Sequence, residues 1–153
     1  MSIAYTLRMR TFQVSEYRAD REEPCTSPSS AVQALRAIFA GIDTDVESFV
    51  LLAMNAKGKI VGFKTIGQGT TTATLASPRE VLRSALVLGA VSMLIAHNHP
   101  SGDPRPSHED IALTRRIRAA GETIGIPLAD HIILGSEDKY TSIRVLEHWD
   151  SNN

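Results

Sequence analysis

The sequence contains a single cysteine, Cys25, among 153 residues. One thiol cannot form a disulfide within the chain, and it cannot supply the several thiolates of a cysteine-based structural zinc site. The lack of a disulfide framework indicates a reducing compartment, and residues 1–8 lack the apolar core of a signal peptide. We therefore expect a cytoplasmic protein.

The chain also has little net charge and no long apolar run. Its 16 basic and 17 acidic residues leave a net charge of -1, which implies no overall attraction to DNA or to a membrane surface. The longest apolar stretch, residues 84–96, is interrupted by Gly89 and Ser92 and is too short to cross a membrane. Hydrophobic residues make up 42% and charged residues 22%, which is typical of one globular domain of this length.

Hydrophobic periodicity predicts helices interleaved with strands. Helices are expected at residues 28–41, 78–88 and 107–122, each opened by a serine, and in the second of them Leu86 is expected to face the core with Val81, Leu82 and Ala85. Strands are expected at residues 3–17, 47–53, 60–66, 91–96, 128–134 and 140–146. A turn at residues 55–58 joins two of these strands into a hairpin.

This order of elements indicates an α/β (α+β) fold with a mixed sheet flanked by helices. We expect one globular domain over residues 27–150, preceded by an N-terminal strand and linker over residues 1–26.

Most of the chemistry is concentrated in residues 97–110. His97 and His99 are two positions apart at the end of an apolar strand, so both imidazoles can point to the same side. Three prolines stiffen the loop that follows, and Asp110 lies in the first turn of the next helix. Two imidazoles and one carboxylate could hold a zinc ion and leave a fourth position for water, whose pKa zinc lowers to about 7.

A base is then needed to take the proton from that water, and Glu47 at the start of an apolar strand is the candidate. Each of these residues also has an ordinary interpretation. Ser107 and Asp110 fit a plain capping box, Glu47 fits a solvated strand start, and His-x-His fits a polar loop. The joint pattern favours the metal site, because independent ordinary roles do not explain the spacing.

Glu47, His97-x-His99 and, after seven intervening residues, Ser107-x-x-Asp110 together resemble the JAMM (MPN+/JAB) metalloprotease signature. Shorter matches over residues 27–147 narrow the resemblance to the bacterial RadC family. They are Gly69-Thr70, Pro78-Arg79-Glu80, Ala96-His97-Asn98-His99-Pro100-Ser101-Gly102-Asp103-Pro104, Pro106-Ser107, Glu109-Asp110-Ile111 and Asp130-His131-Ile132-Ile133.

The resemblance implies a cytidine-deaminase-like three-layer fold that holds one zinc ion. His97, His99 and Asp110 would be the metal ligands, Glu47 the general acid/base, and Ser107 the donor that stabilises the oxyanion. The substrate would be a peptide or protein, including a ubiquitin-like conjugate, cleaved at a peptide or isopeptide bond.

Two other functions stay open at this point. One is a DNA-repair-associated factor or nuclease, which the low net charge and the lack of a recognisable helix-hairpin-helix segment disfavour. The other is a non-catalytic MPN interaction module, which would not need all five site residues. The oligomeric state is also open. For Asp130 and His131 we favour a hydrogen-bonded pair at a strand end over a role beside the metal.

Overall fold

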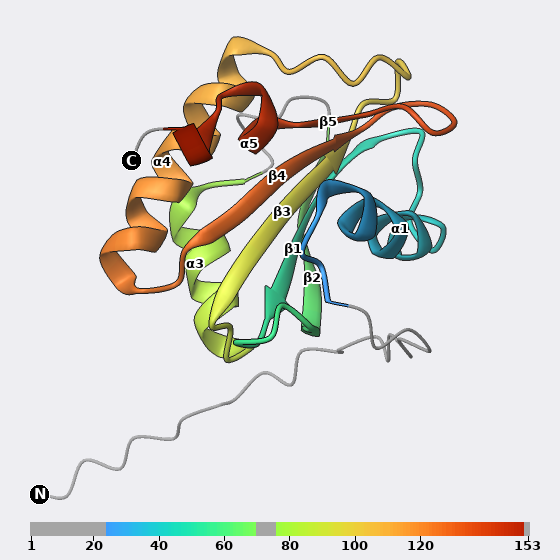
Figure 1. Ribbon diagram of the computed structural model, residues 1–153. Helices are drawn as coiled ribbons and strands as arrows, with labels where there is room; N and C mark the ends of the chain where they lie inside the picture. The colour runs from blue at the N-terminus through green and yellow to red at the C-terminus, as the bar shows by residue number, and fades with distance from the viewer. Residues whose placement is uncertain (1–23, 70–75, 152–153) are drawn as a thin grey trace, which may run out of the picture.

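The computed structural model describes residues 24–69 and 76–151 (Figure 1). The strands in this part are β1 (Glu47–Met54), β2 (Ile60–Gly69), β3 (Ser92–Asn98), β4 (Leu128–Leu134) and β5 (Tyr140–Ser142). The helices are α1 (Pro28–Phe39), α3 (Pro78–Val87), α4 (His108–Ile124) and α5 (Ile143–Leu146), followed by a short 3-10 helix, η1 (Trp149–Ser151). The strand predicted at residues 3–17 and most of the predicted linker lie outside the described residues.

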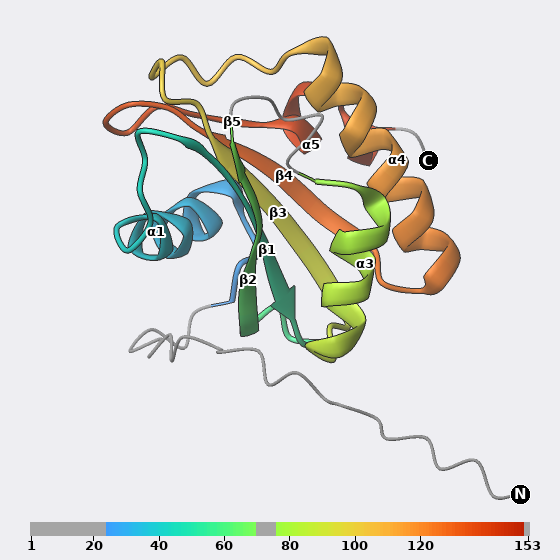
Figure 2. The ribbon, with the colours of Figure 1, turned by 180° about the vertical axis from the view of Figure 1, so that it is seen from behind.

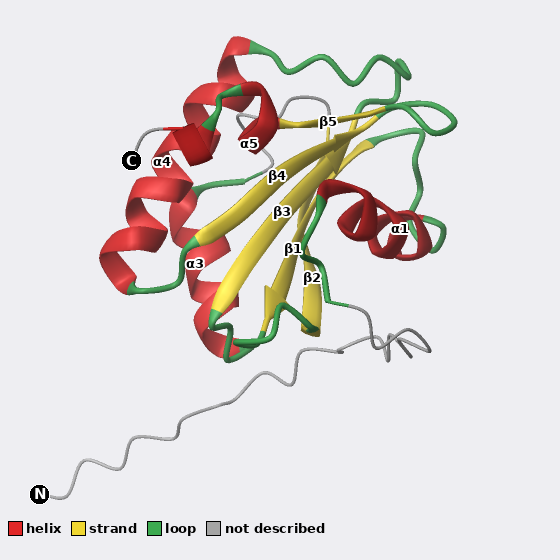
Figure 3. Ribbon diagram, viewed as in Figure 1, coloured by secondary structure: helices red, strands yellow, loops and turns green. Residues whose placement is uncertain are grey.

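The five strands form one mixed sheet in the order β2-β1-β3-β4-β5 (Figure 3). β1 runs antiparallel to both β2 and β3, β3 runs parallel to β4, and β4 runs antiparallel to β5. Parallel neighbours need a crossover connection, and α4 supplies it between β3 and β4. The start of α4 is therefore reached directly from the end of β3, with only a loop between them.

The sheet lies between two helical layers, α1 on one face and α3 with α4 on the other (Figures 1 and 2). Alternate residues of each strand pack into two hydrophobic cores, one on each face of the sheet. Phe49 and Ile95 pack toward α3 and α4, whereas Val50 and Leu94 pack toward α1. The predicted class, a mixed sheet flanked by helices in three layers, is confirmed.

Serine caps start the three long helices, as their sequences predict. Ser27 and Ser107 each form a complete capping box. Ser77 also caps α3, where its hydroxyl accepts a hydrogen bond from the backbone N–H of Glu80. The Glu80 carboxylate pairs with Arg83 at 2.8 Å, and no hydrogen bond to the backbone of Ser77 accompanies it, so only half of that predicted box is present.

The prediction that Leu86 faces the core is wrong, since its exposed fraction is 56%. At 100° per residue the buried arc of α3 is centred on Val81 and Ala85, with Ser84 on one side and Leu82 on the other. Leu86 falls beyond Leu82, outside this arc.

The strand predicted over residues 140–146 is also wrong beyond its third residue. β5 ends at Ser142, and α5 begins immediately after it. The buried carboxylate of Asp130 accepts hydrogen bonds from the Ser142 hydroxyl at 2.6 Å and from the backbone N–H of Arg144 at 3.0 Å. This tertiary contact turns the chain into a helix where the local pattern favours a strand.

Among the described residues, none of the helices combines the length and the apolar character that a membrane span requires.

Gly121 is required where α4 packs against the segment that enters β4. A Cβ atom at this position would lie 2.5 Å from the carbonyl oxygen of Ile126 and 2.8 Å from the methyl group of Met93. We expect Gly121→Ala to lower the free energy of unfolding by about 1–3 kcal/mol, because the added methyl group has no room. This loss outweighs the higher helix propensity of alanine, which would stabilise an uncrowded helix. Urea unfolding measures this. Gly41→Ala is the control, because its Cβ would meet only an ordinary contact at 3.6 Å. An unchanged or raised stability for Gly121→Ala would contradict this packing.

Candidate metal centre

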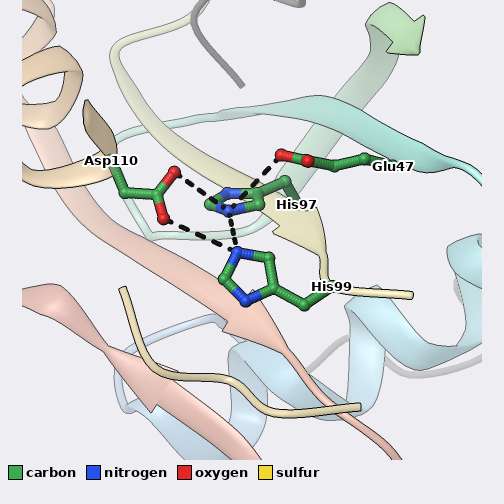
Figure 4. Close-up of side chains that lie close together, drawn as sticks. All are labelled: Glu47, His97, His99 and Asp110. Atoms are coloured by element: carbon green, nitrogen blue, oxygen red, sulfur yellow. Dashed lines mark hydrogen bonds and ion pairs between the residues drawn. The ribbon is translucent and has the colours of Figure 1, made fainter. Parts of the chain in front are cut away.

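Four side chains from three separate segments converge at the end of β3 (Figure 4). They are Glu47 at the start of β1, His97 in β3, His99 just after β3, and Asp110 in the first turn of α4. One ligand atom from each residue lies within 4.8 Å of the others. The structure thus brings together all three expected ligands and the expected base.

The pairing of β1 with β3 brings Glu47 to this place. Phe49 is the register partner of His97, and the two strands are antiparallel, so the start of β1 lies beside the end of β3. The ring of Phe49 stacks on the His97 imidazole with centroids 5.8 Å apart and an angle of 7° between the planes. This stacking fixes the plane of His97.

Asn98 points away from the metal-site residues and anchors the segment that leads into β1. Its side-chain oxygen accepts a hydrogen bond from the backbone N–H of Ser48 at 2.8 Å. Its amide nitrogen donates to the carbonyl oxygens of Thr44 and Val46. Asn98 has no predicted role in the sequence analysis, and the one local signal for it is that a polar residue ends a buried strand.

The loop between β3 and α4 is held against the turn between β4 and β5. The backbone N–H of His99 donates to the carbonyl of Leu134 at 2.9 Å, and that of Ser136 donates to the carbonyl of Gly102 at 2.9 Å. A Cβ atom at Gly135 would lie 2.5 Å from the Gly102 oxygen, so the close approach requires glycine. His99 is therefore presented by a braced loop.

Asp110 has two roles at once. Its Oδ2 accepts a hydrogen bond from the backbone N–H of Ser107 at 2.7 Å, and the Ser107 hydroxyl accepts one from the backbone N–H of Asp110 at 3.0 Å. The ordinary capping interpretation is therefore present. The other oxygen, Oδ1, is fully buried and has no hydrogen-bond partner among the described residues. A buried carboxylate oxygen of this kind needs a cation or another donor.

The distances between ligand atoms are short. His97 Nε2 lies 3.0 Å from His99 Nε2 and 3.3 Å from Asp110 Oδ1, and His99 Nε2 lies 3.5 Å from Asp110 Oδ2. Glu47 Oε1 is somewhat farther out, 3.8 Å from His97 Nε2. Ser107 joins this group only through its hydrogen bonds with Asp110.

The electrostatics couple Asp110 to both histidines. Burial raises the pKa of the Asp110 carboxyl, but its close electrostatic interactions with His97 and His99 outweigh burial and hold the pKa well below its usual range. The interaction with Asp110 raises the pKa of His99. Burial lowers this pKa, and the hydrogen bond to the backbone carbonyl of Asp103 raises it further. Asp110 is thus a carboxylate, the form in which it can bind a cation.

His131 lies directly behind His97, which corrects the interpretation of Asp130 and His131 as a strand-end pair. His131 Nε2 is 2.8 Å from His97 Nδ1, and both side chains are fully buried in the interior of the sheet. The Asp130 carboxylate accepts a hydrogen bond from the backbone N–H of His131 and not from its imidazole. Burial lowers the pKa of His131 well below its usual value. The parallel pairing of β3 with β4 decides this contact, and the local sequence carries no signal for it.

Two histidines and two carboxylates meet at the end of a central strand in a three-layer fold, as the resemblance to the JAMM signature leads us to expect. The chain belongs to the RadC-like JAB domain family, whose model matches residues 25–148. The resemblance read from the sequence is confirmed.

Curated relatives carry uninformative names. The chain is 41% identical over 146 residues to a UPF0758 protein of Trichormus variabilis and 40% identical over 146 residues to one of Nostoc sp.. In both cases 95% of this chain is aligned, and it spans 58% of the length of the relative. A UPF0758 protein of Desulforamulus reducens is 47% identical over 102 residues, which cover 67% of this chain and 44% of that protein.

Proposed function

We propose that this protein is a zinc-dependent hydrolase of the JAMM type. Its substrate is a cytoplasmic peptide or protein, including a ubiquitin-like conjugate, cleaved at a peptide or isopeptide bond. The observation that carries the proposal is the fully buried Oδ1 of Asp110, which has no hydrogen-bond partner among the described residues and lies 3.3 Å from His97 Nε2, while Oδ2 of the same carboxylate lies 3.5 Å from His99 Nε2. The family membership supports the same chemistry.

The separations between the donor atoms support zinc as the ion. In a tetrahedral zinc site with bonds of about 2.0–2.1 Å, the ligand atoms lie about 3.3 Å from one another. His97 Nε2 and His99 Nε2 are 3.0 Å apart, and the Asp110 carboxylate lies 3.3 Å from the first through Oδ1 and 3.5 Å from the second through Oδ2. Two imidazoles and a carboxylate also form a donor set that zinc prefers, and three protein ligands leave a position open.

A zinc ion held by His97, His99 and Asp110 would lower the pKa of a bound water to about 7 and would polarise the substrate carbonyl. We assign to Glu47 the role of the base that takes the proton from the attacking water and passes it to the leaving amine. Its Oε1 lies 3.8 Å from His97 Nε2, which is farther than the 3.0–3.5 Å between the atoms of the three ligands. Its side chain is 12% exposed. Glu47 therefore stands beside the ligand set with access to solvent, as a proton carrier must.

Ser107 offers its hydroxyl group as a hydrogen-bond donor. Its Oγ accepts the backbone N–H of Asp110 through a lone pair, so the O–H is available to donate. We assign this donor to the oxyanion that forms when water adds to the carbonyl. The capping box fixes the position of the hydroxyl against the ligand Asp110.

The test combines metal analysis with a cleavage screen. We expect the purified protein to carry about one zinc ion per chain. It should cleave members of a library of peptides and isopeptide-linked conjugates, lose this activity to a chelator and regain it with zinc. Cleavage that survives complete removal of zinc, or a zinc-loaded protein that cleaves neither class, would contradict the proposal. Salt-sensitive DNA binding without cleavage would favour the DNA-associated alternative instead.

A further inference from the structure

A chain of buried hydrogen bonds runs behind the candidate metal centre and joins two of its ligands. His97 Nδ1 lies 2.8 Å from His131 Nε2, and His131 Nδ1 lies 2.6 Å from the Thr114 hydroxyl oxygen. That hydroxyl lies 2.6 Å from the backbone carbonyl oxygen of Asp110. The side chains of His97, Thr114 and His131 are fully buried.

The direction of each hydrogen bond follows from its last acceptor. The carbonyl oxygen of Asp110 can only accept, so the single proton of the Thr114 hydroxyl is donated to it. The hydroxyl oxygen must then accept from Nδ1–H of His131. A neutral imidazole carries one N–H, which leaves Nε2 of His131 as an acceptor and makes Nδ1 of His97 the donor.

The consequence for His97 is a fixed tautomer. With its proton on Nδ1, Nε2 carries the lone pair, and this is the atom that lies 3.3 Å from Asp110 Oδ1 and 3.0 Å from His99 Nε2. His99 reaches the same tautomer by another route, because its Nδ1 donates to the carbonyl oxygen of Asp103 at 2.7 Å. When both rings are neutral, two lone pairs face each other across 3.0 Å, an arrangement that a shared cation stabilises.

We infer that His131 and Thr114 are positioning residues of the metal centre: they set the tautomer of His97 and tie it to the helix that carries Asp110. This inference rests on the proposed metal site. The hydrogen bonds run from the backbone of Asp110 through Thr114 and His131 to His97, and a bound ion would close the circuit to the Asp110 carboxylate. The ligands from β3 and α4 are thereby held together even before the ion binds.

Loss of these buried hydrogen bonds should weaken metal binding without removing a ligand. In His131→Leu the Nδ1–H of His97 loses its acceptor in a buried place, and the opposite tautomer, whose Nε2 carries a proton, cannot bind a cation. We expect zinc affinity to fall about 10–100-fold, as is usual when the partner of a ligating histidine is removed. Thr114→Val should give a smaller loss in the same direction, because His131 keeps its place but its proton is no longer directed.

The experiment measures zinc dissociation constants by competition with a chromophoric chelator, together with the 15N shifts of His97 in the zinc-free protein. His131→Gln is the conservative variant, since its side-chain oxygen can accept from His97, and it should regain most of the affinity lost in His131→Leu. Thr123→Val is the matched control, because Thr123 makes the same hydrogen bond to the carbonyl four residues earlier in α4 but is exposed. It should bind zinc like the original chain.

Urea unfolding of the zinc-free variants shows whether each one is folded when its zinc affinity is measured. A loss of affinity in a folded variant then reflects lost positioning of His97 and not a general loss of stability. Zinc affinity that stays at the original value in folded His131→Leu and Thr114→Val would overturn the inference, as would 15N shifts showing His97 protonated on Nε2 in the original chain. Zinc retained after replacement of both His97 and His99 would instead overturn the metal site itself. The two failures are therefore distinguishable, and neither readout depends on hydrolysis.

Discussion

Replacement of Glu47 by glutamine is expected to leave zinc bound and to remove nearly all hydrolysis. Glutamine has almost the same shape but cannot take a proton from water, and a positioned general base contributes about 10²–10⁴-fold to the rate. The substitution leaves the three ligands unchanged, and Glu47 Oε1 lies 3.8 Å from His97 Nε2, farther than the ligand atoms lie from one another. We expect kcat on a cleaved library member to fall by about this factor, with the zinc content unchanged.

Glu122→Gln is the matched control for this change. Glu122 is exposed near the end of α4, where it pairs with Arg118 at 3.4 Å. This variant should keep both its zinc and its rate. If Glu47→Gln remains fully active, Glu47 has no part in proton transfer. If it loses its zinc as well, Glu47 is a ligand rather than a base.

Replacement of His97 and His99 by alanine together is expected to remove the zinc. The two imidazoles supply two of the three ligands, and a single carboxylate does not hold zinc at cellular concentrations. Zinc per chain should fall from about one to below about 0.1, measured by elemental analysis after gel filtration. Hydrolysis should fall to background with it.

The double variant also leaves His131 Nε2 without its partner in the core. We expect it to lose about 1–3 kcal/mol of stability beyond that caused by the absent zinc. Circular dichroism and urea unfolding show whether the variant is folded when its metal is measured. His108→Ala is the control, because His108 is exposed at the start of α4. A folded double variant with full zinc content would show that the ligand assignment is wrong.

Much of the fold could be predicted because its signals are local. Ser27, Ser77 and Ser107 lie directly before helices, and the turn at residues 55–58 joins two strands. A cap or a tight turn is decided by residues three or four positions apart, so the sequence shows it directly. The alternation of His97 and His99 is equally local.

Other features depend on partners far away in the sequence. The helical start of α5 depends on Asp130, which binds the backbone of Arg144 and the hydroxyl of Ser142 across two strands. Leu86 is exposed because the sheet contacts a narrower arc of α3 than the hydrophobic pattern covers. Periodicity gives the polarity of an element but not the width of the surface that meets it.

The sequence by itself determined which side chains are available for chemistry and which of them share a strand or a helix turn, because such placement follows from the geometry of one element. The tertiary structure decided that Glu47 lies beside His97, that the Asp110 carboxylate faces both histidines, and that His131 lies behind His97. These contacts depend on strand order and register, which are set by packing over the whole sheet.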